Sequence, residues 1–254
     1  AANIEEISGG RRSLNVVNAW FRPELEKAGI AFPEHDDRYG YGVEWLTIVR
    51  RLLSGERVSH EGRYFSIDDY QINPTGRLRS RPEIYVGGES DQARDLVATQ
   101  GDVWFINGQP IERVRELIAD VGRRERTGSP VRYGLSAFVI ARDDAESAQR
   151  ELDHHWKPNE LDQPVLTNIA GGADEKAVMF QTFARYPAIG TNGGTAAGLV
   201  GSYDEVADRI ADFHRAGIET FMLQFQPFEA DMERFAAEVI PRVHERLGAV
   251  VAAP

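Results

Sequence analysis

The first predicted strand of the chain ends in polar residues of a kind that could bind a ligand. Asn15 and Asn18 flank two valines at the end of a short apolar run. In parallel α/β folds, binding groups collect beyond the carboxyl ends of the strands. An asparagine amide can both donate to and accept from a ring carbonyl or a phosphate. The alternative is structural, because Asn15 could satisfy a strand end and Asn18 a turn.

A second polar strand end follows at Gly87-Gly88-Glu89-Ser90. Glycines let a ligand approach the backbone closely, and the free N–H groups at the start of a helix capped by Ser90 would form a site for an anion. A phosphate fits there, although a Gly-Gly pair before a helix also occurs for packing reasons alone. The chain has neither a GxGxxG nor a GxxxxGK(S/T) motif, so this is neither a dinucleotide fingerprint nor a P-loop.

The run His35-Asp36-Asp37-Arg38-Tyr39 lies between these two strands in the sequence. Arg38 and Tyr39 suit a phosphate or the carbonyl of a ring, while pairing of Arg38 with a capping carboxylate is the structural alternative. A histidine beside two carboxylates could bind a metal, but these carboxylates are adjacent and no second histidine is near. We therefore expect an anion site here rather than a metal site.

Composition argues against several classes of function. The formal net charge of −11 disfavours a nucleic-acid partner, and the absence of cysteine excludes disulfides, thiolate metal sites and cysteine nucleophiles. The chain has no GxSxG elbow of a hydrolase. No apolar run reaches the roughly 20 residues of a membrane span, and the first residues lack the apolar core of a signal peptide. We expect a cytoplasmic enzyme without a membrane partner.

Short apolar runs alternate with longer amphipathic stretches, which is the pattern of βα units around a parallel sheet. The predicted strands are residues 14–17, 83–86, 102–106, 133–141 and 220–225. The predicted helices are residues 40–53, 91–100, 110–124, 143–155, 203–216 and 229–247. Because about eight strands are needed to close a (β/α)₈ barrel, periodicity alone leaves an open five-stranded sheet as an alternative.

Two segments interrupt this rhythm. Residues 54–81 contain the alternating run HEGRYFSI and are interpreted as a hairpin-like insertion rather than a barrel element. Residues 156–200 are long, glycine-rich and weakly periodic, and such a stretch in a compact domain is usually a functional lid or disordered. We expect part of this second segment to be a mobile lid over the site.

Six segments taken together resemble the bacterial-luciferase-like flavin-dependent monooxygenases, in the branch that holds alkanesulfonate monooxygenase, dimethyl sulfone monooxygenase and pyrimidine oxygenase. They are ISGGRRSLNVVNAWFRPELEKAG, HDDRYGYGVEWLTIVRRLL, HEGRYFSI, IYVGGESDQARDLVA, GLVGSYDEVADRIADF and ERFAAEVIPRV. Their order and spacing are more specific than any one of them. The resemblance implies a single luciferase-like TIM (β/α)₈ barrel domain over residues 1–254. It also implies that the given chain lacks the first three βα units, which normally precede ISGGRRSLNVV.

The resemblance assigns flavin contacts to the strand ends, to the WFRPE stretch, to the RY pair and to the serine after Gly-Gly. The expected FMN-binding residues are Asn15, Glu24, Arg38, Tyr39, Ser90, Asn18 and Gly88, the last two by neighbourhood. His35 stands where several relatives also have histidine and is the candidate catalytic residue. No metal ligand is expected.

The implied activity is that of a two-component monooxygenase, in which a separate flavin reductase supplies FMNH₂ that reacts with O₂ to oxygenate a small substrate. Alkanesulfonate monooxygenases have an arginine and a histidine on the strand where this chain has Ser136 and Phe138, and an arginine where it has Asn192. They also have a tyrosine at the end of the last strand, near Gln226 here. Without those cations a neutral substrate such as a sulfone, an amide or a heterocycle is favoured. A homo-oligomer is expected. The alternatives are a deazaflavin-dependent dehydrogenase on the same fold and a flavin-binding protein without turnover.

Overall fold

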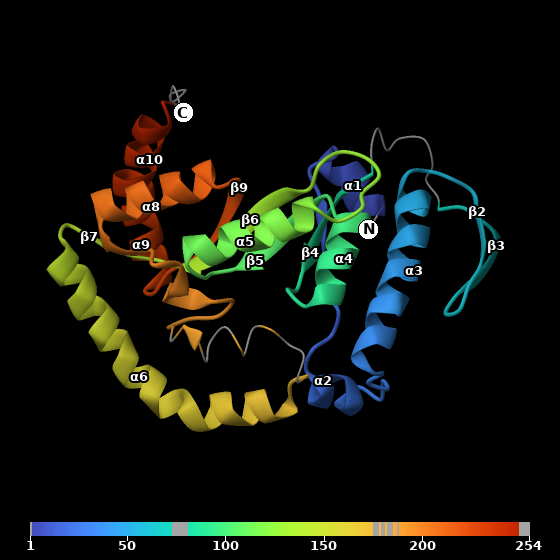
Figure 1. Ribbon diagram of the computed structural model, residues 1–254, viewed down its shortest axis with the longest axis horizontal. Coiled ribbons are helices and arrows are strands. Elements are labelled where there is room, and N and C mark those ends of the chain that lie inside the picture. Colours follow the sequence, from blue (N-terminus) through green and yellow to red (C-terminus); the bar gives the residue numbers. More distant parts are fainter. Residues whose placement is uncertain are drawn as a thin grey trace. The chain divides into compact units, whose positions relative to one another are not determined.

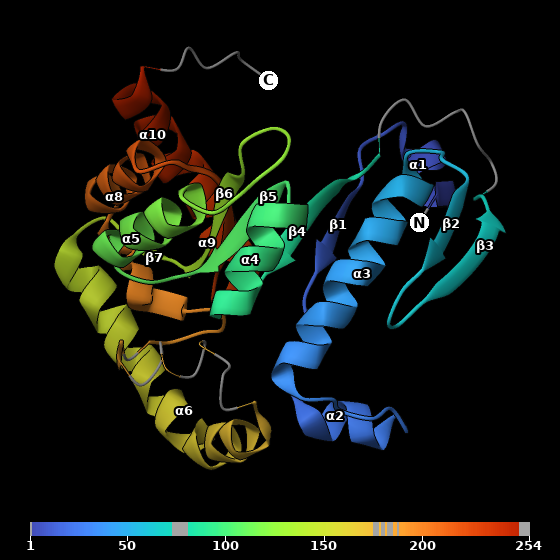
Figure 2. The same cartoon turned by 45° about the vertical axis from the view of Figure 1, so that its right-hand side comes forward.

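The computed structural model describes residues 2–72, 81–174 and 188–248, together with residues 178, 181, 185 and 186. The described chain is an α/β fold with parallel strand pairs and helices packed against them (Figure 1, Figure 2). It divides into two compact units. Residues 1–104, 121–131 and 174–176 form the first, and residues 105–120, 132–173 and 177–254 form the second. The predicted α/β class is confirmed, whereas the single domain stays a prediction.

The first unit contains a parallel strand pair, an antiparallel hairpin and the helices between them. Its elements are α1 (Ala2–Ser8), β1 (Ser13–Val16), α2 (Arg22–Lys27), α3 (His35–Leu53), β2 (Val58–Glu61), β3 (Ser66–Tyr70), β4 (Glu83–Gly87) and α4 (Asp91–Gln100). In the pair of β1 and β4, Asn15 lies opposite Tyr85. Ile84 and Val86 are fully buried while Asn15 is exposed. One face of the pair therefore belongs to the core and the other carries the polar strand end.

The long helix α3 begins at His35, five residues before its predicted start at residue 40. Its buried residues recur at helical spacing and form one stripe; they are His35, Arg38, Gly42, Leu46, Ile48, Leu52 and Leu53. Acidic residues occupy its first turn and arginines its last, which complements the helix dipole. The predicted helix is thus correct but too short, and the run 35–39 forms its first turns.

The hairpin of β2 and β3 lies within the segment predicted as an insertion. The Glu44 carboxylate of α3 accepts hydrogen bonds from the backbone N–H groups of Arg63, Tyr64 and Phe65, at 2.9 to 3.2 Å, and lies 3.0 Å from His60 Nε2. Burial alone would raise the pKa of Glu44, but the hydrogen bonds from His60 and the turn backbone outweigh it and lower that pKa. One carboxylate of α3 therefore fixes the turn of the hairpin. Residues 73–80 of the predicted insertion lie outside the described residues.

The second unit contains two further parallel strand pairs. The elements in this part of the chain are β5 (Val103–Asn107), α5 (Ile111–Gly122), β6 (Arg132–Phe138), β7 (Ile140–Arg142), α6 (Ala145–Gly172), the 3₁₀ turn η1 (Gly194–Ala197), β8 (Val200–Ser202), α8 (Tyr203–Arg215), β9 (Ile218–Gln224), α9 (Phe228–Arg234), the π turn η2 (Phe235–Val239) and α10 (Ile240–Leu247). β6 pairs with β9 and β7 with β8. The five predicted strands are all present, and four of them differ from prediction by at most two residues at either end.

The strand predicted for residues 133–141 is instead two strands, β6 and β7. Val139, which separates them, donates its N–H to the Gln224 carbonyl at 3.0 Å, while the next N–H, of Ile140, donates to the Leu199 carbonyl at 2.9 Å. The chain changes its hydrogen-bond partner at this point. A continuous apolar run cannot reveal such a change, because both strands are buried.

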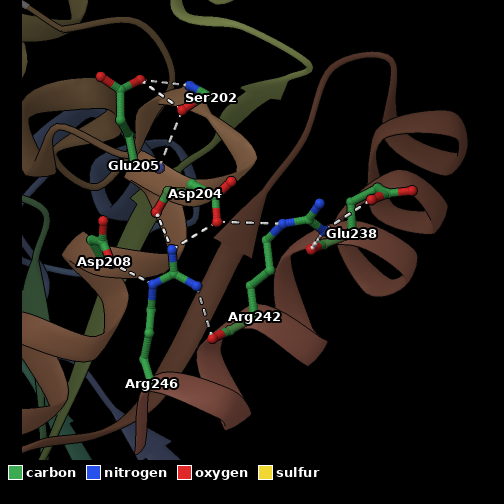
Figure 3. A network of polar contacts seen from close by, with 7 residues as sticks. All are labelled: Ser202, Asp204, Glu205, Asp208, Glu238, Arg242 and Arg246. Carbon is green, nitrogen blue, oxygen red and sulfur yellow. Dashed lines mark hydrogen bonds and ion pairs between the residues drawn. The ribbon is translucent and has the colours of Figure 1, made fainter.

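Arginines of α10 tie that helix to the N-terminal end of α8. Figure 3 shows the network, which comprises Ser202, Asp204, Glu205, Asp208, Glu238, Arg242 and Arg246. The Arg246 guanidinium donates to Asp204 at 2.7 Å and to Asp208, and the bond to Arg246 lowers the pKa of Asp204. Ser202 and Glu205 form a capping box at the start of α8. Ion pairs therefore hold the last helix to α8.

The helix predicted for residues 143–155 is too short. α6 continues from Ala145 to Gly172, whereas the predicted helix ended at residue 155. Pro158 and Pro164 lie in the added part of the helix, although proline removes one helical hydrogen bond and usually breaks a helix. The helix nevertheless passes both positions. Most of residues 175–187, in the middle of the segment 156–200 expected to hold a lid, lie outside the described residues.

The glycine-rich end of that segment is tightly packed. A Cβ added at Gly194 would lie 1.8 Å from the Ile189 carbonyl oxygen, and one added at Gly193 would lie 2.0 Å from the Gly108 carbonyl oxygen. Both glycines have positive φ, which L-residues rarely adopt. The N–H and hydroxyl of Thr191 each lie 3.2 Å from the side-chain oxygen of Gln224. The described end of the segment 156–200 therefore forms a closely packed turn that requires glycine at these two positions.

We predict that Asp102→Asn destabilises the first unit in a pH-dependent way. Asp102 accepts from Arg81 at 2.7 Å and from the Ile84 N–H at 2.8 Å. Burial would raise its pKa, but these two donors lower it overall. A carboxylate with a lowered folded pKa stabilises above its unfolded pKa, and this stabilisation is lost as the pH falls through the folded value. The free energy of unfolding should fall by about 2 kcal/mol at pH 7.

Urea denaturation at pH 7 and at pH 3 measures this difference, which should shrink at the lower pH. Asp69→Asn is the matched control, because Asp69 forms an exposed ion pair with Arg57 and its positive φ is tolerated by asparagine. Equal losses for the two variants, or a loss for Asp102→Asn that does not change with pH, would contradict the role given to Asp102.

Candidate functional site

Five of the predicted site residues come together in the first unit. Tyr39 contacts the residues that follow β4, and Arg38 directly precedes it on α3. Asn18, which follows β1, contacts Gly42, three residues after Tyr39 on the same helix. We call this group the Tyr39–Ser90 cluster; its members are Asn18, Arg38, Tyr39, Gly88 and Ser90. They come from three separate stretches of the sequence, and the parallel pair of β1 and β4 brings two of these stretches to the same edge.

Gly88 and Ser90 form the turn from β4 into α4. Gly88 has φ +106°, and a Cβ there would lie 3.1 Å from both the Tyr39 hydroxyl and the Ala93 Cβ. Trp104 Nε1 donates to the Gly88 carbonyl at 2.9 Å and fixes the turn. Ser90 caps α4, since its hydroxyl oxygen accepts from the Ala93 N–H at 3.2 Å. The earliest N–H groups of α4 have no intrahelical acceptor and carry the positive end of the helix dipole.

Tyr39 places a neutral hydroxyl beside this helix start. A side-chain hydrogen bond joins its phenol to Ser90. Burial raises the pKa of Tyr39 above its ordinary value, and Asp174 adds to this, while Ser90 and Arg38 oppose it. The phenol therefore keeps its proton at neutral pH and can donate to an anion. Its ring lies 4.8 Å from the ring of His35, centroid to centroid.

Arg38 is buried and already neutralised. Its side chain is 7% exposed and pairs with Asp174, whose side chain is 12% exposed. The guanidinium also donates to the Pro33 carbonyl and lies 4.1 Å from the centroid of the Phe32 ring. The structural alternative considered for Arg38, an ion pair with a carboxylate, is therefore present, but the partner is not a capping residue. Asp174 and Phe32 were not predicted, because no motif marks them and Asp174 lies 136 positions away.

Asn18 has an unsatisfied amide. Its Nδ2 is buried and has no hydrogen-bond partner among the described residues. The amide lies against Gly42, where an added Cβ would be 2.7 Å from the Asn18 oxygen. A buried donor without an acceptor costs roughly 1–3 kcal/mol. A ligand oxygen beside Asn18 would remove that cost, so the geometry makes Asn18 a candidate in its own right and not only by neighbourhood in the sequence.

The remaining predicted residues differ in position. His35 is buried at 7% exposure beside the cluster, and its Nδ1 lies 3.1 Å from the Asp36 carboxylate, which also accepts from Gln92 of α4 at 3.0 Å. Asn15 is exposed on the polar face of β1. Glu24 is exposed in the first turn of α2. No contact described in this part of the chain links Asn15 or Glu24 to the cluster, so their roles stay predictions.

The cluster is suited to an anion. The start of α4, the Ser90 and Tyr39 hydroxyls and the Asn18 amide are all donors, and none of them carries a charge that must be neutralised. A phosphate at the start of α4 would receive several hydrogen bonds in a partly dry setting. The described cluster contains no strong nucleophile, so chemistry here would have to be supplied by a bound group.

The chain belongs to the luciferase-like monooxygenases, because the model of the family described as "Luciferase-like monooxygenase" matches residues 1–220. The predicted family is therefore confirmed. The matched residues include every member of the Tyr39–Ser90 cluster.

Particular relatives support the same assignment. An "FMNH(2)-dependent dimethylsulfone monooxygenase" of Pseudomonas putida is 28% identical over 255 residues, covering 96% of this chain and 69% of that protein. A protein of the same description from Pseudomonas fluorescens (strain Pf0-1) is 30% identical over 260 residues, covering 96% and 68%. The chain thus spans about two thirds of their length.

Solved structures share the fold. A crystal structure of riboflavin lyase with modified FMN and riboflavin has a TM-score of 0.72 at 18% identity, covering 98% of this chain and 67% of that one. EDTA monooxygenase from Chelativorans sp. BNC1 has a TM-score of 0.67 at 19% identity, covering 98% and 74%. At these identities the likeness establishes the fold alone.

We predict that Asn18 and Gly42 are energetically coupled. Alanine in place of a helical glycine stabilises by up to about 1 kcal/mol, but at Gly42 its Cβ meets the Asn18 amide. Gly42→Ala should therefore raise the free energy of unfolding in an Asn18→Ala background, and by about 0.5–1.5 kcal/mol less in the native background. Urea denaturation of the four proteins of the cycle gives the coupling. Gly171→Ala is the control, since nothing lies within 4 Å of an added Cβ there. If the effects of the two substitutions on the free energy of unfolding are additive, Asn18 and Gly42 are not coupled and the prediction is wrong.

Proposed function

We propose that this chain is a flavin-dependent monooxygenase that uses reduced FMN and O₂ to oxygenate a small, neutral organic substrate. The observation that carries the proposal is the Tyr39–Ser90 cluster at the start of α4, within the residues matched by the family. Its neutral donors and the unsatisfied Asn18 amide fit a cofactor that bears a phosphate. The names of the Pseudomonas relatives, which specify FMNH₂, support the choice of cofactor.

The residues of the cluster would hold the cofactor by its phosphate. The Ser90 hydroxyl and the first N–H groups of α4 donate to phosphate oxygens, and the Tyr39 hydroxyl donates from the other side of the turn. Asn18, with Asn15 on the polar face of β1, supplies amides for the polar edge of a ring. When bound, reduced FMN supplies the reaction with O₂. The protein's own part is to bind, to orient and to exclude water.

The substrate proposal depends on strand β6 of the second unit. Ser136 and Phe138 are buried there at 1% and 7% exposure, and residues 134–140 contain no cation. A buried sulfonate would need a cationic partner. We therefore favour a sulfone, an amide or a heterocycle, and the dimethylsulfone named for the Pseudomonas relatives supports the first of these.

The proposal includes a flavin reductase as the source of FMNH₂, a cytoplasmic location and a homo-oligomer built on a (β/α)₈ barrel. It also includes a lid in the region of residues 156–200. His35, buried beside the cluster, is the candidate catalytic residue. Glu24 completes the proposed flavin contacts. These points follow from the family resemblance.

Anaerobic titration with FMNH₂, followed by aeration with sulfones, sulfonates and pyrimidines, tests the activity. Oxygen consumption with a mass increase of one oxygen atom in a neutral product is the expected result. Hydride transfer from a reduced deazaflavin without oxygen uptake would favour the dehydrogenase alternative. Flavin binding without any product would favour a binding protein.

We predict that Ser90→Ala and Tyr39→Phe each weaken FMN binding about tenfold, since each removes one hydrogen bond to the phosphate. Riboflavin, which lacks the phosphate, should bind both variants nearly as it binds the native chain. Fluorescence titration measures both ligands. Tyr41→Phe is the control, because Tyr41 lies on the same helix but is 48% exposed. Equal losses for FMN and riboflavin would place the phosphate elsewhere.

A further inference from the structure

We infer that Asp174 sets the phosphate affinity of the Tyr39–Ser90 cluster, because its carboxylate forms a buried ion pair with Arg38, the cation that directly precedes Tyr39 on α3. This inference rests on the proposed function and deepens it. Asp174 would be a residue that acts through Arg38, and phosphate binding would compete with the Arg38–Asp174 ion pair.

The geometry fixes both members of the pair. The Arg38 guanidinium stacks on Phe32, donates to Pro33 and pairs with Asp174, and its Nε has no partner among the described residues. Asp174 is held by its backbone, since its N–H donates to the Trp20 carbonyl at 2.8 Å. The carboxylate is thus presented to Arg38 by a fixed backbone rather than by a flexible chain.

The Tyr39 hydroxyl links the Arg38–Asp174 ion pair to the proposed anion site. Although burial is the larger cause of the raised pKa of Tyr39, the positive charge of Arg38 lowers that pKa and the negative charge of Asp174 raises it. The Tyr39 oxygen is bonded to Ser90 and lies against Gly88 at the start of α4. A phosphate placed there is therefore attracted by Arg38 and repelled by Asp174. Both side chains are largely buried, so screening by solvent is weak and the repulsion is felt.

The opposite role for Asp174 makes the opposite prediction. If the carboxylate served to orient Arg38 toward the phosphate, removal of its charge would release the guanidinium and weaken binding. If it competes, removal of its charge strengthens binding. The sign of the change in affinity separates the two, and it does so without any measurement of turnover.

The test is Asp174→Asn, which keeps the shape and removes the charge. Competition predicts that FMN and inorganic phosphate bind the variant about tenfold more tightly, within the usual range of coupling between sites. Riboflavin should bind unchanged. Asp36→Asn is the matched control, because Asp36 is an acidic residue of the same helical turn that contacts Gln92 and His35. It should leave all three affinities within about twofold.

Unchanged or weaker FMN binding by Asp174→Asn overturns the inference, as does an equal gain in Asp36→Asn, which would reflect net charge alone. Should the variant not fold, hydrogen exchange in the native chain decides. FMN should speed exchange at the Asp174 amide and slow it at the start of α4, and slower exchange at both overturns the inference. If the native chain binds no FMN at all, the proposed function fails instead, and the phosphate titration still tests the competition.

Discussion

The buried charge of Arg38 is the constraint around which the first unit is arranged. An uncompensated guanidinium in a dry interior is very costly, and removing its partner leaves that cost exposed. Here the compensation comes from the Asp174 carboxylate, the Pro33 carbonyl and the face of Phe32. Because Asp174 lies 136 positions along the chain from Arg38, the start of α3 is fixed by a long-range pair and not by local capping.

The fixed start of α3 in turn determines the anion site. Tyr39 follows Arg38 directly, so the position of the guanidinium decides where the phenol meets Ser90 and Gly88. The hairpin adds to this from outside, since the Tyr64 hydroxyl donates to Asp37 at 3.0 Å and Glu44 holds the turn from which Tyr64 comes. A loss of either support would move the Tyr39 hydroxyl relative to α4.

The sequence could predict the cluster because its members carry local signals. A Gly-Gly-x-Ser turn before a helix and an Arg-Tyr pair at a helix start each have a mechanism that is visible in a few residues. Asp174 could not be found in this way, because an isolated aspartate in a glycine-rich stretch has no pattern. The same limit applied to α6, which continues past residue 155 into a weakly periodic stretch. It applied also to β6 and β7, where a change of hydrogen-bond partner leaves no trace in an apolar run.

The cost of burying a charge also decides which kind of ligand would suit each unit. At the start of α4 an anion is offered helix N–H groups and neutral hydroxyls, with Arg38 near. On β6 the buried Ser136 hydroxyl has no partner among the described residues, and Phe138 packs against Gly190 and the His155 ring. The Ser136 hydroxyl could give an anionic group one hydrogen bond, far less than the desolvation of a charge requires. A neutral group with one acceptor, by contrast, would satisfy Ser136 at little cost. The physics that draws a phosphate to the Tyr39–Ser90 cluster thus favours an uncharged partner at β6.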